Sequence, residues 1–362
     1  MSKKTTIRDI AKQAGVSYQT VSRVINNRPD VAKETRLRVE QTINDMGYLP
    51  SQMARSLRNK RTKTIGLIVP DIANPFFAEI AKGVEDAGFA GGYTVSLCNS
   101  NMTLQRELAY LERLQTKGVD GIIFIAATAQ INHIRPLIDR GLPVIMFYRD
   151  SGGLKVDTFK VDNIQMGYTA TKHLLELGHR DIACIQPASP QTPSQGRIEG
   201  FRRALTECGL RANPTLMVRG NNLLSGGREA ALKLVQDGAQ FTAIFAGNDA
   251  MAIGAMRALR SGGYRIPEDV SVVGVDDITL ASYAEPPLTT IAQPKQEAGT
   301  QAVRCLIERI EGNYEGGPRR IALDTHIIVR ESTSMVKDCP QNKVRDVLHN
   351  PQGTPRGLPL GI

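Results

Sequence analysis

Tryptophan is absent from this 362-residue sequence, and aromatic residues make up only 5% of it. Cysteine is sparse: the five cysteines form no C-x-x-C pair, which argues against a zinc ribbon or a disulfide scaffold and fits a reducing compartment. The longest apolar runs, near 65–69 and 121–127, are far shorter than the roughly 20 residues of a membrane span. The N-terminal segment lacks the apolar core of a signal peptide. We therefore expect a cytoplasmic protein with no membrane segment.

Motifs of catalysis and cofactor binding are also missing. The sequence contains no G-x-G-x-x-G or G-x-x-x-x-G-K-[ST] loop opening a helix after a strand, no H-E-x-x-H and no G-x-S-x-G. Its five histidines do not have the spacing of metal ligands. The sequence therefore predicts no enzyme activity, no catalytic residues, no cofactor and no metal.

The net charge of +9 is concentrated at the N-terminus. Residues 1–63 hold 14 Lys and Arg against five Asp and Glu, whereas residues 64–362 hold 31 of each kind. A basic module attached to a neutral body indicates a polyanion-binding head. The alternative is a basic tail that only improves solubility.

Three short helices are expected in this head. Thr6, with Asp9 three residues later, resembles a capping box before a helix that Gly15 ends. Ser17 is a good N-cap for a second helix, and a third is expected from about Ala32 to Met46. The core of this head is predicted from the apolar positions, which are Val21, Val24 and Ile25 in the second helix and Leu37, Val39, Ile43 and Met46 in the third.

Two short helices joined by a glycine turn indicate a helix-turn-helix, whose second helix enters the major groove of DNA. Polar side chains on that helix can bond base edges, and those at the helix starts can bond phosphates. The alternative is a small protein-interaction domain. The candidate DNA contacts are Thr5, Thr6, Ser17, Tyr18, Gln19, Thr20, Ser22, Arg23 and Asn26.

Residues 51–61 form a short basic segment. It is long enough for a helix that would be marginal alone in water, with Met53 and Leu57 on one face. Arg55 and Arg58 supply charge that can bind phosphate. The alternative is a flexible basic linker.

From residue 64 onward, apolar runs alternate with helical stretches, which is typical of α/β lobes with parallel strands. The expected strands are 65–69, 94–97, 121–125, 144–147, 182–185, 243–246 and 270–275. The expected helices are 76–87, 105–117, 168–177, 196–208, 228–236, 250–260 and 296–311. About 270 residues suffice for two doubly wound lobes.

Ligands of such sheets bind beyond the carboxyl ends of the strands. Polar and aromatic residues stand at those positions, which suits a small polar ligand. Phe76 and Phe77 are equally explained as core, Asp249 as the cap of the following helix, and Asp277 as the cap of a turn. The residues at the strand ends are Asp71, Asn74, Phe76, Phe77, Tyr148, Arg149, Arg197, Asn248, Asp249, Asp276 and Asp277.

The runs TIRDIAKQAGVSYQTVSRVINN and YLPSQMARSLRNKRTKTIGLIVPD resemble the LacI/GalR family of transcription regulators. In the body, NPFF, RIEGF, GNDAMAIGAMRAL and SVVGVDD resemble the same family, whose effector domain has the fold of type I periplasmic sugar-binding proteins. The resemblance implies a hinge helix that folds on DNA and inserts Leu57 into the minor groove of a palindromic operator.

The same resemblance implies which residues contact the effector, namely Asn74, Phe76, Phe77, Arg197, Asn248 and Asp276. Two positions depart from the family. Tyr148-Arg149 stands where many relatives carry Asp-Arg, and Asn221 or Asn222 stands where some relatives place a ring. Asp162-Asn163 is a pair typical of the family, which we interpret as structural.

The predicted fold class is an all-α helix-turn-helix head plus an α/β two-lobed effector domain with parallel sheets. We expect the head at 1–50, the hinge helix at 51–61, the effector domain at 62–336 and a disordered tail at 337–362. The near lobe takes about 62–161 and 292–323, and the far lobe about 162–291 and 324–336. The tail has no leucine heptad of the kind that forms tetramers in the family, so a homodimer is expected.

These features together predict a repressor that binds double-stranded DNA and responds to a sugar, a sugar acid or a similar metabolite. Arg149 beside Arg197 makes an anionic group on this metabolite plausible. An exported solute-binding protein would account for the body but not for the basic head. A sugar-acting enzyme would need a catalytic pair that the sequence does not show.

Overall fold

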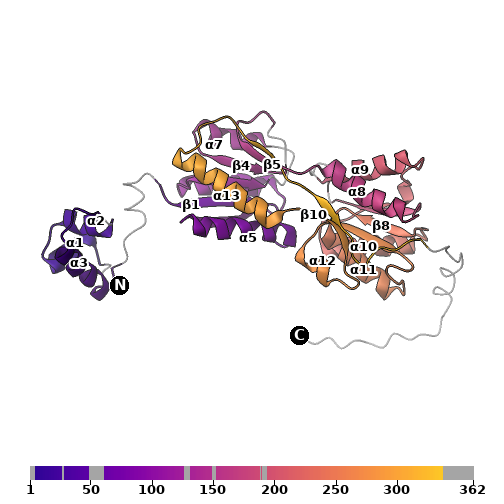
Figure 1. Cartoon of the computed structure of the whole chain (residues 1–362), viewed down its shortest axis with the longest axis horizontal. Coiled ribbons are helices and arrows are strands. Elements are labelled where there is room, and N and C mark those ends of the chain that lie inside the picture. The colour runs from indigo at the N-terminus through magenta and orange to yellow at the C-terminus, as the bar shows by residue number, and fades with distance from the viewer. Residues whose placement is uncertain are drawn as a thin grey trace. The chain divides into compact units, whose positions relative to one another are not determined.

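The computed structural model describes residues 5–26, 28–48, 61–125, 131–148, 152–187, 189 and 194–336. They form a helical unit at the N-terminus and a much larger α/β unit (Figure 1). The predicted hinge contacts Arg55, Leu57 and Arg58, the predicted effector contact Arg149 and the tail after residue 336 lie outside these residues.

The helical unit contains α1 (Ile7–Ala14), α2 (Tyr18–Ile25) and α3 (Lys33–Asp45). The capping box is present, because the Thr6 amide donates to Asp9 Oδ2 over 2.8 Å and the Asp9 amide to Thr6 Oγ1 over 3.3 Å. Gly15 ends α1 with φ 63°, a value that glycine adopts at little cost. Ser17 Oγ accepts from the Thr20 amide over 3.1 Å and begins α2. The local capping signals are therefore confirmed.

A small apolar core holds the three helices together. It is built from Ile10, Ala11 and Ala14 of α1, Val21 and Val24 of α2, and Val39 of α3. The prediction that Leu37 is inward is wrong, since this side chain is 59% exposed. Successive residues of an α-helix are about 100° apart, so two residues separated by two positions point to nearly opposite sides. Val39 takes the core position, and Leu37 is left in solvent.

The α/β unit contains two six-stranded sheets. The first has the order β11-β5-β4-β3-β1-β2, and the pairings from β11 to β1 are parallel. Its central strands are apolar on both faces, as expected for a sheet covered on both sides. The strands are β1 (Thr64–Val69), β2 (Thr94–Asn99), β3 (Gly121–Ile125), β4 (Val144–Phe147), β5 (Asp157–Lys160) and β11 (Arg320–Ala322).

The second sheet has the order β12-β10-β9-β8-β6-β7. All its pairings are parallel except that of β12 with β10, which is antiparallel. Two sheets dominated by parallel strands confirm the predicted fold class. The strands are β6 (Ile182–Gln186), β7 (Met217–Arg219), β8 (Ala243–Ala246), β9 (Ser271–Asp276), β10 (Thr289–Ala292) and β12 (His326–Ile328).

Helices cover both sheets (Figure 1). In the first, α5 and α13 pack together against one face, and Leu114 of α6 packs at Gly66 of β1 on the other. In the second, α8 and α9 form one pair and α10 and α11 another. The remaining bounds are α5 (Pro75–Ala90), α6 (Leu104–Thr116), η1 (Asn132–Ile134), α7 (Arg135–Asp139), α8 (Asn163–Glu176), α9 (Gln195–Glu207), η2 (Pro214–Leu216), α10 (Leu224–Gln236), α11 (Asp249–Ser261), α12 (Thr279–Tyr283) and α13 (Lys295–Glu311).

The chain passes between the sheets three times. It leaves the first sheet after β5, returns to it after β10, and leaves it again after β11 to add β12 to the second. Each sheet is therefore assembled from segments that are far apart in the sequence. The segments between β5 and α8 and between β10 and α13 carry residues of the site described next.

Candidate functional site

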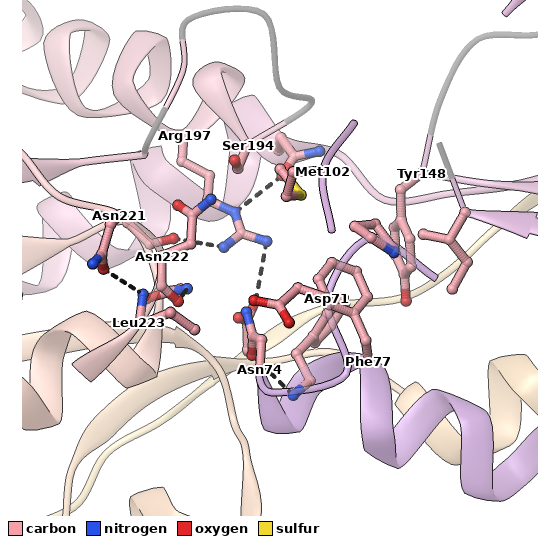
Figure 2. A pocket seen from close by; sticks show the side chains of 17 residues that line it. Asp71, Asn74, Phe77, Met102, Tyr148, Ser194, Arg197, Asn221, Asn222 and Leu223 are labelled. Carbon is pink, nitrogen blue, oxygen red and sulfur yellow. Dashed lines mark hydrogen bonds and ion pairs between the residues drawn. The ribbon is translucent and has the colours of Figure 1, made fainter. Parts of the chain in front are cut away.

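A cavity of about 110 Å³ is lined by residues that follow strands of both sheets. Figure 2 shows the Arg197 guanidinium among these side chains, with Asn221, Asn222 and Leu223 on one side and Phe77 and Tyr148 on the other. The lining residues are Pro70, Asp71, Asn74, Phe76, Phe77, Met102, Ile125, Tyr148, Asn163, Ser194, Arg197, Asn221, Asn222, Leu223, Gly247, Asn248 and Asp276.

Several helices begin at this cavity. Asn74 caps α5 by accepting from the Phe76 amide over 3.1 Å, and Asn248 caps α11 by accepting from the Met251 amide over 2.9 Å. Arg197 lies in the first turn of α9. Helix N-termini carry partial positive charge and present amide donors. The cavity is therefore suited to a ligand rich in oxygen acceptors, in the place where open α/β sheets bind ligands.

Arg197 and Asp276 form a buried ion pair across the cavity. Arg197 Nη2 lies 3.0 Å from Asp276 Oδ1, and the two side chains are 8% and 4% exposed. Arg197 Nε donates to Asn163 Oδ1 over 3.0 Å, and Nη1 donates to the Gly247 carbonyl over 2.6 Å. Three guanidinium nitrogens are thus fixed before any ligand binds, which holds the group in one orientation.

Behind this pair lies Asp249, which is fully buried. The prediction that Asp249 caps α11 is wrong, because Asn248 is the cap. The Asp249 carboxylate instead accepts from the Ile278 amide over 2.9 Å and from Thr290 Oγ1 over 2.5 Å. It thereby joins the end of β9 to β10, because the short side chain at the first helical position points into the sheet.

Burial also determines the ionisation of these carboxyl groups. It raises the pKa of Asp249 to about 7, and the nearby charge of Asp276 adds to the rise. Burial likewise raises the pKa of Asp276, whereas Arg197 and Lys295 act to lower it. Two carboxyl groups this close do not both ionise easily, so Asp249 is the one that holds a proton near neutral pH.

We expect Asp249→Asn to change the pH dependence of stability. The folded-state pKa lies above the unfolded value of about 3.9, so the stability that the proton supplies is complete below pH 4 and lost as the pH rises through 7. Denaturant unfolding from pH 4 to 8 should show this loss in the wild-type protein and a flatter curve in Asp249→Asn. Parallel curves for the two proteins would contradict the assignment.

Tyr148 lies at the end of β4 with φ 60°, and its ring packs 5.4 Å from that of Phe76. Its hydroxyl is buried and makes no hydrogen bond within the described part of the chain. Burial raises the pKa of this phenol, so it stays protonated and can donate. An unpaired buried hydroxyl at a cavity is a point of attachment for a ligand oxygen.

Backbone strain is concentrated at the cavity. Seven described residues other than glycine have positive φ, and four of them line it: Met102, Tyr148, Asn222 and Asp276. Such conformations are costly for residues with a Cβ and persist only where the surroundings enforce them. This concentration is a second and independent indication that the cavity is functional.

The predicted effector contacts that the structure describes all line this cavity: Asn74, Phe76, Phe77, Tyr148, Arg197, Asn221, Asn248 and Asp276. Phe76 is also 6% exposed and part of the core, so both interpretations of it hold. Asp277 does not cap a turn through its side chain but pairs with Arg330 over 2.7 Å. Asp162 caps α8, as a structural role requires, but its neighbour Asn163 also faces Arg197.

Met102, Ser194 and Leu223 also line the cavity and were not predicted. Met102 follows β2, whose end carries no other chemical signal, and Ser194 precedes α9 without a capping hydrogen bond. Leu223 stands next to Asn221 and Asn222, which were singled out as a pair. Only Leu223 could have been found from the sequence, by extending that pair to its neighbour.

On the helical unit, the polar residues of α2 are largely open to solvent. Tyr18 is 53% exposed, Gln19 and Arg23 are also exposed, and Ser22 and Thr20 are partly buried. Arg23 lies 3.5 Å from Asp30, and both side chains are 55% exposed, which makes this a weak pair. Thr5, Thr6, Ser17 and Asn26 stand at the ends of α1 and α2.

Two further searches cover the described residues only. They contain no cluster of three or more His, Cys, Asp or Glu side chains that could hold a metal ion. In the same part of the chain, no helix combines the length and the apolar character that a membrane crossing requires.

Comparisons with known proteins cover both units. Residues 6–51 match the family described as bacterial regulatory proteins, lacI family, and residues 62–330 match periplasmic binding proteins and the sugar-binding domain of the LacI family. The transcriptional regulator DegA of Bacillus subtilis is 40% identical over 334 residues, which are 91% of this chain and 98% of DegA.

Solved structures agree with these matches. A lac repressor dimer bound to operator and the anti-inducer ONPF is 26% identical with a TM-score of 0.79, over 92% of this chain and 100% of that one. A complex of the transcriptional regulator CelR with cellobiose is 34% identical with a TM-score of 0.68, over 91% and 99%. This chain belongs to the lacI family of bacterial regulatory proteins.

Proposed function

We propose that this protein is a sequence-specific repressor that binds a palindromic operator as a homodimer and is controlled by a small polar effector. The observation that carries the proposal is one chain that joins a helix-turn-helix with an exposed polar face to a strained, polar cavity. The lac repressor structure, a dimer bound to operator, supports the DNA partner and the dimer.

The DNA contacts are proposed on α2 and the helix ends beside it. Gln19 can bond adenine with its amide, and Arg23 can bond guanine or phosphate. Thr5, Thr6, Ser17, Thr20 and Asn26 are placed for the phosphate backbone, with Tyr18 and Ser22 beside the bases. We further propose residues 51–61 as a hinge helix, with Leu57 entering the minor groove and Arg55 and Arg58 on phosphates.

We expect Gln19→Ala to relax sequence preference. The loss of one side chain that reads a base should cost about 1–3 kcal/mol of specific binding, with little change in non-specific binding. Selection from random DNA should return a pseudo-palindrome for the wild-type protein and a motif degenerate at one or two positions per half-site for the variant. A non-symmetric motif would contradict the dimer, and an unchanged motif would contradict the role of Gln19.

The effector is proposed to be a sugar or a similarly hydroxyl-rich metabolite. The lining supplies amides, a guanidinium, carboxylates and three aromatic rings, which suit a polar ligand with an apolar face. The cellobiose bound to CelR supports this class. A thermal-shift screen of mono- and disaccharides and sugar acids should raise the unfolding temperature for the true class, because a bound ligand stabilises the folded state. Flat curves throughout would contradict the class.

Four further points belong to the proposal. Residues 1–50 are the head, 62–161 and 292–323 one effector lobe, and 162–291 and 324–336 the other. The protein acts in the cytoplasm, where its DNA lies. It is not an enzyme, because the cavity contains no pair of groups arranged for acid–base or nucleophilic chemistry. Arg149 is proposed as a further effector contact beside Tyr148.

A further inference from the structure

The segment Asp276–Thr279 joins β9 to α12 and carries the cavity's carboxylate. Its backbone is unusual, because Asp276 and Asp277 have φ of 126° and 50°. Two such residues in succession are costly and need support from their surroundings. Every supporting group named below is a side chain from another element, so the geometry of Asp276 is imposed from outside its own strand.

Support from the second sheet comes from two residues. Asp249 accepts from the Ile278 amide over 2.9 Å, and Arg330 pairs with the Asp277 carboxylate over 2.7 Å. Gln293, which follows β10, donates to Asp276 Oδ1 over 2.7 Å. These contacts stay within the lobe to which β9 belongs.

Support from the other lobe comes from Lys295 and Glu79. Lys295, the first residue of α13, donates from Nζ to the Asp276 carbonyl over 2.6 Å and to the Asp277 carbonyl over 2.5 Å. Glu79 of α5 accepts from the Thr279 amide over 2.8 Å through Oε1, and its Oε2 lies 3.5 Å from Lys295 Nζ. The two side chains are 6% and 17% exposed.

The ammonium of Lys295 has three donors, and the structure offers it three close acceptors. Two are carbonyls of the strained segment and the third is the Glu79 carboxylate, which also neutralises the charge. A buried ammonium without such partners would be costly. Arginine would present a planar group in place of this tetrahedral one, and methionine would leave two buried carbonyls without a donor.

The helices that supply these groups are closely packed on each other. A Cβ added at Gly83 of α5 would lie 2.2 Å from the Gln296 carbonyl, and one at Gly299 of α13 would lie 2.6 Å from the Ile80 carbonyl. Only glycine permits this approach. α5 and α13 therefore move together, and α5 also carries Asn74, Phe76 and Phe77 at its cavity end.

We propose that Lys295, oriented by Glu79, is a positioning residue that holds Asp276 in its ligand-facing geometry from the opposite lobe. The inference rests on the proposed function only in that Asp276 is taken as an effector contact. Its consequence is that Asp276 keeps its position only while α5 and α13 keep theirs. Relative movement of the lobes and the state of the cavity carboxylate are thus one event.

Hydrogen exchange of the full-length protein without any effector tests this proposal. In Lys295→Met, the amides of Ile278 and Thr279 should exchange at least about tenfold faster, while strands β6 and β8 keep their protection. Glu79→Ala should expose the Thr279 amide in the same way. Lys82→Met is the matched control, because Lys82 also lies on α5 but pairs only with Asp86 at the surface.

A second measurement follows the guanidinium itself. With ¹⁵N-labelled arginine, the Nε–H resonance of Arg197, assigned by its loss in Arg197→Lys, should shift in Lys295→Met and stay in place in Lys82→Met. Unchanged exchange and an unchanged resonance would overturn the proposal. A uniform rise of exchange in both sheets would overturn it as well, because it would show a purely structural role. Neither readout depends on an effector, so a failure of the sugar screen remains a separate result.

Discussion

Asp276→Asn should destabilise the protein strongly and abolish its response to effector. The change keeps the shape of the side chain but leaves the Arg197 guanidinium buried without its counter-charge. Breaking a buried pair by removing one partner costs about 3–5 kcal/mol of folding free energy. Denaturant unfolding and the thermal-shift screen measure the two effects. Relief of the repulsion between Asp276 and Asp249 offsets a part of the loss.

A double variant separates the lost pair from the lost carboxylate. Arg197→Met combined with Asp276→Asn removes both charges, so it should recover stability relative to Asp276→Asn while still failing to bind effector. Arg265→Met with Asp269→Asn is a matched surface control, since that pair lies at 2.6 Å with the arginine 63% exposed. It should change stability by less than about 1 kcal/mol. A cost below that value for Asp276→Asn would show that the pair is not desolvated.

Gly167→Ala should have an effect of similar size through the backbone. A Cβ at Gly167 of α8 would lie 1.9 Å from the carbonyl of Arg197 on α9. Alanine favours a helix over glycine by about 1 kcal/mol, but overpacking against a neighbouring backbone costs about 3 kcal/mol or more, so the clash prevails. The helix that carries Arg197 must move away. We expect lower stability in denaturant and no thermal shift with the effector.

Gly317→Ala serves as the control for this substitution. No atom lies within 4 Å of the Cβ that it would add, so stability and effector response should stay within about 0.5 kcal/mol of the wild type. Gly200→Ala should reproduce the Gly167 result, because its Cβ would lie 2.0 Å from the Ile164 carbonyl of α8. A Gly167→Ala protein that responds to effector normally would show that α9 can shift without moving Arg197.

Local signals made the head predictable. The caps at Thr6 and Ser17 and the turn at Gly15 depend on residues within one helical turn, so reading the sequence is sufficient to place them. The failure at Leu37 came from accepting two apolar positions that a helix cannot turn to the same side. In the α/β unit, the long apolar strands were found, but β5, β7 and β10–β12 have only three or four residues each and were missed.

The cavity was predictable to the extent that it follows the ends of strands. Asn74, Arg197, Asn248 and Asp276 all occupy such positions and meet at one cavity. Lys295 could not be found in this way, because its partners are backbone carbonyls and a carboxylate from distant segments. A lysine near the start of a helix looks like a surface residue until the sheets are assembled.

The three crossings between the sheets also set the order in which the molecule can be completed during synthesis. The first sheet contains β1–β5 but needs α13 to cover it and β11 to finish its edge, and both come after β10. A ribosome must therefore translate nearly all of the second sheet before the first can close. Until about residue 322 has emerged, the nascent chain exposes the apolar face that α13 covers, which makes that interval the one most open to aggregation and most dependent on chaperones.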